Sequence, residues 1–488
     1  MRLLEGIRRI WLVLACIAVV TSGCTTNPAT GDSSFTLFMS PADEIRVGAQ
    51  EHPKILARFG GVYDDPNVGG YVAEIGGRLV ANSEMPNFAF TFTVLNSPDV
   101  NAFALPGGYV YVTRGLLALA NSEAELAAVI GHEIGHVVAR HTAQRYSQAV
   151  ATGLGAALLG AIVGNEAQQI AQLGSELYLA GYSRDQEFQA DELGVRYTRN
   201  AGYSPSGMAG FLRNLVRNKA LQERILDQEL PEADFFSTHP NTPQRVARAA
   251  GLAAGADGVV RRDEMLNAVA GMVYGDDPKQ GLIRGQTFSH PDLALTFDAP
   301  AGFRLINTED AVYARQRNVA IIRFDAVPRD KAHPDPYVYL TQVWAPNIRL
   351  SEGERIMVNG LPAATAAAQV SGSFDDYRGP LDARLVVVQF PGNRLYRLLF
   401  LSVPPRTAGL RDGFQRMTYS LRQLSTPEIA RLVPLTVELL RVGSGDTVES
   451  LAAGLPFPDL RVERFRVLNG LEPGEAPPSG ALVKIVAE

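Results

Sequence analysis

The segment Gly131–His136 reads GHEIGH and has the residue spacing of a metal-binding helix. On a helix, His132 and His136 lie on one face a turn apart, so two neutral imidazoles can bind one Zn²⁺. Glu133 then lies beside the metal, where its carboxylate can take a proton from an attacking water molecule. The alternative is a pair of core histidines that hydrogen-bond within a helix. Because only seven histidines occur in 488 residues, the spacing favours the metal site.

A catalytic zinc site needs a third protein ligand and one open position. The candidate ligand is Glu187, in the run YSRDQEFQAD that ends at Asp191. Its carboxylate would complete a site of two histidines and one glutamate. Asp191 lies one helical turn further on, where it would hydrogen-bond a ligand imidazole and fix its orientation. The alternative is that both acids belong to a solvated helix face.

Capping side chains and apolar spacing predict the elements that position these residues. Ser122 and Glu125 have the pattern of a capping box, which predicts that a helix begins at Ser122. A second helix is predicted over residues 183–200. Further helix starts are predicted where proline follows a short polar residue, at Ser40-Pro41, Asp65-Pro66, Ser204-Pro205 and Thr242-Pro243.

Two predicted strands precede the metal-binding helix. Residues 88–94 alternate in polarity, residues 109–112 are β-branched or aromatic, and residues 103–108 are predicted to be the turn between them. Such a pair can provide an open edge for an extended peptide, or it can be ordinary core sheet. Further along, the small apolar residues 149–164 predict a buried or lid-like helix, with a membrane-dipping helix as the alternative.

The N-terminal residues have the order of a secretory signal. Arginines precede an apolar run and small residues, and Cys24 follows. The small residues before Cys24 resemble a bacterial lipobox, which implies a signal peptide over residues 1–23 and lipidation of Cys24. Plain secretion and a retained anchor are the alternatives. Residues 24–39 are predicted to be a tether. By resemblance to bacterial lipoproteins, Thr25 implies an outer-membrane protein facing the periplasm.

The second half of the chain contains no catalytic constellation. Short β-branched segments dominate from about residue 275, so residues 280–425 are predicted to form a β-rich accessory domain. Residues 433–488 have the order strand, helix, helix, strand. Their GDT and LNGL tracts resemble a LysM module, a small fold that binds glycans containing N-acetylglucosamine. Glycan binding and a purely structural or protein-docking use both stay open. The net charge of -6 argues against nucleic-acid binding.

Several tracts between residues 40 and 255 together resemble the gluzincin metallopeptidase family that includes the CAAX prenyl proteases, HtpX and BepA. The matching tracts are NAFALPGG at 101–108, GHEIGH with His141, the run containing Glu187 and Asp191, and STHP at 237–240 with Arg245. The resemblance implies endopeptidase activity and a single zinc ion held by His132, His136 and Glu187. It implies that Glu133 is the base and later the proton donor, and that His239 and Arg245 lie near the metal.

The expected fold is therefore α+β, with a mainly helical metallopeptidase domain at 40–275, the β-rich domain and the small βααβ module. The leading hypothesis is a lipid-anchored envelope endopeptidase that removes misfolded or misassembled proteins. The alternatives are a peptidoglycan-associated endopeptidase and a chaperone or assembly factor for outer-membrane proteins with secondary proteolysis. His239 or Arg245 could donate to the developing oxyanion. In a second hypothesis, His239 occupies the open metal position and holds the resting enzyme inactive.

Overall fold

The computed structural model describes residues 24–31, 33–159, 181–226, 239, 243–308, 310–328, 335–392 and 394–488. The chain divides into two compact units. The first unit joins the chain up to Tyr274 with Thr436–Ala487, and the second comprises Gly275–Leu435 together with Glu488. The C-terminal βααβ segment therefore belongs to the same compact unit as the helices of the candidate metal site.

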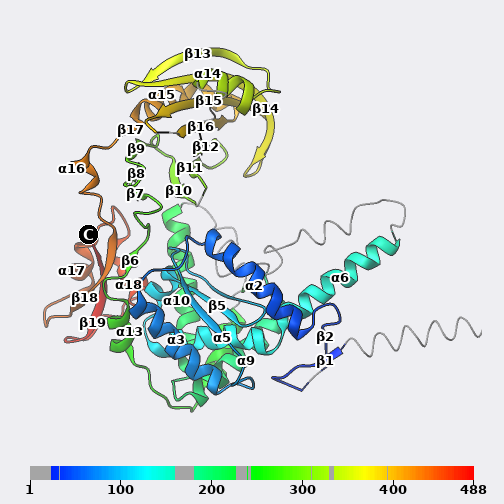
Figure 1. Ribbon diagram of the computed structural model, residues 1–488. Coiled ribbons are helices and arrows are strands. Elements are labelled where there is room, and N and C mark those ends of the chain that lie inside the picture. Colours follow the sequence, from blue (N-terminus) through cyan, green and yellow to red (C-terminus); the bar gives the residue numbers. More distant parts are fainter. Residues whose placement is uncertain are drawn as a thin grey trace, which may run out of the picture. The chain divides into compact units, whose positions relative to one another are not determined.

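The first unit is mainly helical, with small sheets (Figure 1). Its described helices are α2 (Pro41–Arg58), α3 (Pro66–Ala81), α4 (Arg114–Leu119), α5 (Glu123–Val138), α6 (His141–Leu159), α9 (Arg184–Asn200), α10 (Ser206–Leu226), α12 (Pro243–Ala253), α13 (Arg262–Val269), α17 (Val448–Ala453) and α18 (Arg461–Leu468). Its described strands are β1 (Cys24–Thr26), β2 (Ser33–Phe35), β3 (Thr91–Leu95), β4 (Ala102–Leu105), β5 (Tyr109–Thr113), β6 (Val273–Tyr274), β18 (Leu435–Arg441) and β19 (Leu482–Ala487).

Side-chain caps begin these helices where the sequence predicts them. Ser40 and Asp65 cap α2 and α3, and Ser183 caps α9. The Ser122 hydroxyl accepts the Glu125 backbone N–H at 3.2 Å at the start of α5. In a capping box the Glu125 carboxylate would also accept the backbone N–H of Ser122. That prediction is wrong, because the carboxylate instead accepts the backbone N–H of Asn121, the residue before Ser122, at 2.7 Å. The carboxylate thus reaches one residue beyond the cap.

The sheet that lies against α5 has the order β3-β5-β4. Strand β5 is parallel to β3 and antiparallel to β4. The predicted turn over residues 103–108 is wrong in its first half, because Phe103 and Leu105 belong to β4 and are buried. Burial of this short apolar segment outweighs the local turn signal of the proline and glycines that follow it. Among the described strands, β4 forms one edge of this sheet.

The C-terminal segment packs into the same core as the metal-site helices. It has the predicted order β18, α17, α18, β19, and β18 also pairs with β6. Val437 and Val467 share one hydrophobic cluster with residues of α3 and α5. The Lys484 ammonium is fully buried and donates to the backbone carbonyls of Ala118 and Ala120 at 2.6 and 2.7 Å. Burial holds the pKa of Lys484 well below its usual value. The segment thus contacts the chain directly before α5.

The second unit is β-rich, as predicted. Its main sheet is antiparallel and has the order β10-β11-β12-β16-β15-β14-β13, and a smaller sheet has the order β17-β9-β8-β7. Helix α15 buries Phe414 and Met417. The described elements are β7 (Leu282–Arg284), β8 (Thr287–His290), β9 (Leu295–Asp298), β10 (Arg304–Asn307), β11 (Val312–Gln316), β12 (Ala320–Pro328), α14 (Pro336–Val338), the π-helix η1 (Tyr339–Trp344), β13 (Ser351–Val358), β14 (Leu361–Phe374), β15 (Tyr377–Phe390), β16 (Arg394–Ser402), α15 (Pro404–Ser420), β17 (Arg422–Gln423) and α16 (Thr426–Ile429).

Within the described part of the chain, no helix has the length and apolar character required to cross a membrane. The predicted signal peptide, residues 1–23, lies outside the described residues. The apolar segment 149–164 begins in α6, but residues 160–180 lie outside the described part, so its lid-like and membrane-dipping alternatives stay open. The predicted tether contains the β1–β2 hairpin.

Candidate metal centre

Helix α5 carries His132, Glu133 and His136, and helix α9 brings Glu187 and Asp191 to them. The two helices can approach so closely because residue 194 of α9 is glycine. A Cβ at Gly194 would lie 2.8 Å from the backbone nitrogen of His132, which is closer than real Cβ contacts. The contact between the helices therefore requires glycine at this position.

Four buried side chains bring their donor atoms together from three parts of the chain. The donor atoms of His132, His136, Glu187 and His239 all lie within 4.8 Å of one another. His132 Nε2 lies 3.0 Å from His136 Nε2 and 3.2 Å from His239 Nδ1. The Glu187 carboxylate oxygens lie 3.0 Å from His239 Nδ1, 3.4 Å from His136 Nε2 and 3.6 Å from His132 Nε2.

These separations fit a single tetrahedral ion. Nitrogen and carboxylate ligands lie about 2.0–2.2 Å from Zn²⁺, so tetrahedral ligands are about 3.3–3.6 Å apart. The five separations above range from 3.0 to 3.6 Å, which is close to this spacing, and all four donors lie within 4.8 Å of one another. Histidine nitrogens and a carboxylate oxygen are also the donors that zinc prefers. The four side chains therefore form a site that fits one metal ion.

The other ring nitrogen of each helix histidine has a partner that orients the ring. His132 Nδ1 lies 3.0 Å from Asp191 Oδ1. His136 Nδ1 lies 2.8 Å from His141 Nδ1, and His141 Nε2 lies 2.7 Å from the Gln189 side-chain oxygen. Because that oxygen accepts, His141 carries its proton on Nε2 and its Nδ1 accepts from His136. The lone pair on His136 Nε2 then faces the cluster, as a metal ligand requires.

Burial keeps the imidazoles of His136 and His141 neutral. It lowers the pKa of His136 well below its usual value and the pKa of His141 to about 4. The ring of Tyr182 stacks on His136 with 3.8 Å between the ring centroids. Burial raises the pKa of Tyr182 to about 12, so the phenol stays neutral. Neutral imidazoles are the form that binds a metal.

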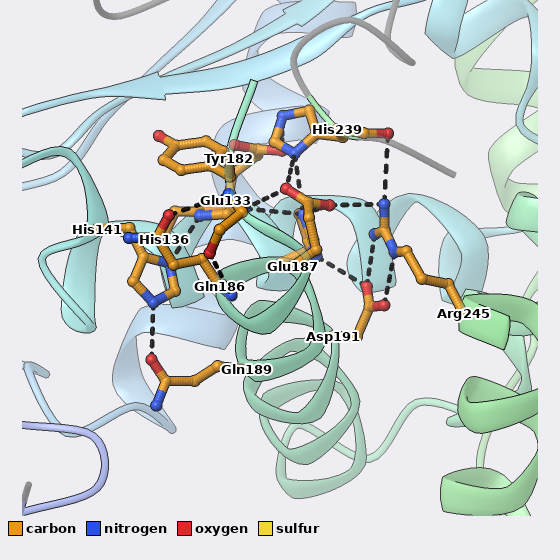
Figure 2. A network of polar contacts seen from close by, with 12 residues as sticks. Glu133, His136, His141, Tyr182, Gln186, Glu187, Gln189, Asp191, His239 and Arg245 are labelled. Carbon is orange, nitrogen blue, oxygen red and sulfur yellow. Dashed lines mark hydrogen bonds and ion pairs between the residues drawn. The ribbon is translucent and has the colours of Figure 1, made fainter. Parts of the chain in front are cut away.

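Arg245 on α12 binds both acids of α9 (Figure 2). Its Nε and Nη2 donate to the two oxygens of Asp191 at 2.8 and 2.7 Å. Its Nη1 lies 2.6 Å from Glu187 Oε2. Burial alone would raise the pKa of Glu187, but the charges of His239 and Arg245 outweigh it and hold that pKa well below its usual value. Arg245 thus keeps the carboxylates ionised and in place, and its guanidinium faces the acids.

Glu133 is fully buried, and neither of its carboxylate oxygens has a hydrogen-bond partner among the described residues. An unpartnered buried carboxylate is costly in a protein interior, so it marks a site where a bound molecule can supply the missing donor. The ring of His239 lies nearby, with Nε2 at 3.4 Å from Glu133 Oε1. Burial raises the pKa of Glu133, which suits a group that accepts and returns a proton.

The structure brings together all the residues that the sequence predicts for the metal site, the first of which is His132 and the last Arg245. Cys24 is separate from them in sequence and lies in β1. The contacts of His141, Tyr182 and Gln189 were not predicted. His141 follows closely after the metal-binding helix in the sequence, and this position is the signal that could have identified it. In the structure Arg140, with a φ of +57°, turns the chain between α5 and His141.

Two helix histidines, a carboxylate from a second helix and an adjacent buried glutamate are the site of a single-metal metallopeptidase. Residues 66–253 match the family described as Peptidase family M48.

Several curated proteins are similar to part of this chain. The chain is 28% identical over 261 residues to "Beta-barrel assembly-enhancing protease" of Escherichia coli (strain K12), covering 49% of this chain and 51% of that protein. It is 32% identical over 158 residues to "Metalloprotease LoiP" of the same strain, covering 32% and 59%. It is 32% identical over 181 residues to "Mitochondrial metalloendopeptidase OMA1" of Schizosaccharomyces pombe, covering 36% and 51%. The chain spans about half the length of the curated relatives it matches.

Proposed function

We propose that the chain is a zinc-dependent endopeptidase that cleaves proteins through a water molecule activated at the α5–α9 site. The observation that carries this proposal is the set of four donors within 4.8 Å of one another beside the buried carboxylate of Glu133, which has no hydrogen-bond partner among the described residues. Sequence similarity to three metallopeptidases supports the same reaction class.

His132, His136 and Glu187 would hold the zinc, which when bound polarises the scissile carbonyl and lowers the pKa of a water molecule towards ~7. Glu133 takes the proton of the attacking water and returns it to the leaving amine. Asp191 holds the His132 ring in place through Nδ1. Arg245 holds Asp191 and Glu187, so its role is to position the carboxylates.

His239 has two possible roles in this site, and the contacts favour inhibition. Its Nδ1 lies among the metal donors, and its Nε2 faces Glu133. With a metal bound, the ring in this position would fill the remaining ligand place and would block the approach of water to Glu133. His239 would then have to move before a substrate binds. In the competing role, His239 stays close and donates to the oxyanion of the transition state.

We further propose that the substrates are misfolded or misassembled proteins of the bacterial envelope. The similarity to the "Beta-barrel assembly-enhancing protease" of Escherichia coli supports this substrate class. The lipobox-like residues before Cys24 support a lipid-anchored position facing the periplasm. The βααβ order of residues 433–488 supports a LysM-like module, whose contact with glycan stays a proposal.

The substrate class can be tested with purified zinc-loaded protein. Casein and crosslinked muropeptides would be incubated side by side with the enzyme, and the products would be identified by mass spectrometry. Cleavage of casein alone is expected. Cleavage of muropeptides alone would establish the peptidoglycan alternative. Wild-type assembly of outer-membrane proteins in a Glu133→Gln strain would favour the chaperone alternative, because that variant keeps the fold and lacks the base.

A further inference from the structure

A cavity of about 600 Å³ lies in the second unit, between helix α15 and the main sheet. Residues of β13, β14, β15 and β16 form its floor, and α15 forms one wall from Thr407 to Tyr419 (Figure 1). We name this cavity the α15 groove. Its volume is within the range of about 300–1,000 Å³ that is usual for a ligand site.

One end of the α15 groove is polar. Gln369, Asp382 and Ser402 lie side by side on β14, β15 and β16. The Thr407 hydroxyl of α15 donates to Asp382 Oδ2 at 2.7 Å and lies 2.8 Å from Ser402 Oγ. These contacts join the start of the helix to the sheet. This end therefore offers hydroxyl, amide and carboxylate groups to a ligand.

The other end of the α15 groove is apolar. Val386 follows Asp382 on the same face of β15 and pairs with Thr365 of β14. Val386 and Phe414 are buried in the main hydrophobic cluster of the second unit, and Ile356 of β13 packs against that cluster. An apolar side chain bound at this end would extend the core of the unit, and its burial would be favourable.

The length of the α15 groove follows from the helix that forms its wall. Thr407 and Tyr419 are the first and last residues of α15 that line it. At about 1.5 Å per helical residue, they are about 18 Å apart along the helix axis. An extended chain advances about 3.3 Å per residue, so the groove has the length of about five extended residues.

The groove also presents charges of both signs. Arg384 of the floor pairs with Glu352 of β13 at 2.5 Å. Glu354 of β13 and Arg411 of α15 also line the groove and are exposed. Neither forms an ion pair within the described part of the second unit. Each can therefore pair with an oppositely charged side chain of a ligand.

An acyl chain and a polypeptide both have the shape of this groove. An acyl chain would remove water from Asp382 and Arg384 without supplying a polar partner, which is costly. A polypeptide instead has a backbone N–H and C=O at nearly every residue. Polar side chains such as Ser351 and Gln415 continue along the groove beyond the polar end and can pair with these groups. The lining therefore favours a polypeptide.

We infer that the α15 groove binds an extended segment of about five residues of another polypeptide. An apolar side chain of this segment lies against Val386 and Phe414, and a basic side chain pairs with Glu354. The binding does not require the reaction at the metal centre. Unfolded proteins expose such segments, so the second unit would hold an unfolded chain through a contact other than that with the cleaved bond.

Peptide binding to the whole chain carrying Glu133→Gln tests this inference without cleavage. Fluorescein-labelled peptides would repeat Leu-Lys-Ser over three, six and twelve residues, and fluorescence anisotropy would give each Kd. The six-residue peptide should bind about tenfold more tightly than the three-residue peptide, because only the longer one reaches both ends of the groove. The twelve-residue peptide should bind within about threefold of the six-residue one, because its added residues lie outside the groove. Replacing leucine by alanine should weaken binding about tenfold.

Two substitutions locate the binding site. Ala367→Trp places a large side chain on the floor of the groove and should weaken binding of the six-residue peptide about tenfold or more. The matched control is Ala408→Trp, which changes an exposed alanine of α15 that does not line the groove and should leave binding unchanged. Glu354→Gln alters an exposed side chain and should remove an advantage of about two- to fivefold that the lysine peptide has over its glutamine version.

Unchanged binding in folded Ala367→Trp would overturn the inference, because the peptide would then bind elsewhere. If the tryptophan variant does not fold, the Glu354→Gln comparison decides, and an unchanged lysine advantage contradicts the inference. Binding of dodecanoic acid by calorimetry, with no binding of any peptide, would also overturn it and identify a lipid cavity. These results leave casein cleavage by the wild-type protein, and thus the proposed peptidase function, standing. Peptide binding in the groove without any casein cleavage would have the opposite meaning.

Discussion

Substitution of His239 by alanine separates the two roles that the geometry allows for this residue. His239 is fully buried, and its Nδ1 lies 3.0 Å from the ionised Glu187 carboxylate. In the blocked state Nδ1 would take a ligand place on the zinc, and Nε2 faces the Glu133 carboxylate at 3.4 Å. A contact with a charged group contributes at most about 1.5–3 kcal/mol, which favours the blocked state by up to roughly 10- to 150-fold. If the ring must leave before substrate binds, removing it should raise kcat/KM by about tenfold or more, because a larger fraction of the enzyme is competent.

The assay is the initial rate of casein cleavage at matched zinc content, with His290→Ala as the control. His290 is a half-buried histidine of β8 in the second unit, and its loss should leave the rate unchanged. A fall in kcat of about 10²–10³ for His239→Ala would refute the inhibitory role, because a loss of this size is typical for the removal of an oxyanion donor.

Three further substitutions test other contacts of the first unit. Arg245→Met should weaken zinc binding about 10- to 100-fold, because it removes the group that holds Asp191 and Glu187, and competition with a chelator measures this; unchanged affinity would contradict the positioning role. Lys484→Met should lower the free energy of unfolding in urea by about 2–4 kcal/mol, because two buried carbonyls lose their donor; an unchanged midpoint would show that the C-terminal segment is not docked through this contact. Burial raises the pKa of Glu44 from 4.5 to about 7, against the charge of Arg140. Between pH 4.5 and about 7, Glu44 keeps its proton in the folded protein but has released it in the unfolded chain. The free energy of unfolding should therefore fall as pH rises through this range, by up to about 3 kcal/mol. Thermal unfolding at pH 5 and pH 7 should show this slope in the wild-type protein and a smaller slope in Glu44→Gln.

Local signals in the sequence predict the metal site well. The spacing of His132 and His136 depends only on helix geometry, and the cap at Ser122 depends on residues within one turn. Glu187 and Asp191 lie one turn apart on a single helix, so their common face is also a local property. The sequence therefore predicts which side chains share a face, and the resemblance to a family supplies the pairing of the two helices.

Contacts between distant segments were not predictable in the same way. The position of α2 depends on the packing of Gly48 against the carbonyl oxygen of Pro106, which no periodicity reveals. Lys484 is a polar residue within an apolar strand, and its burial against the segment before α5 follows from tertiary packing. The strand β4 was missed because the glycines after Leu105 give a strong turn signal, while the burial that favours the strand comes from its neighbours in the fold.

The role of Glu133 at a metal site is the central claim, and one paired measurement on Glu133→Gln tests it. Zinc content by elemental analysis and casein cleavage would be measured on the same preparation, next to the wild-type protein. The variant should retain one zinc ion per chain, because Glu133 is not among the four clustered donors. It should lose cleavage by about 10²–10⁴-fold, because the base is gone. Full zinc content with unchanged cleavage would contradict the mechanism.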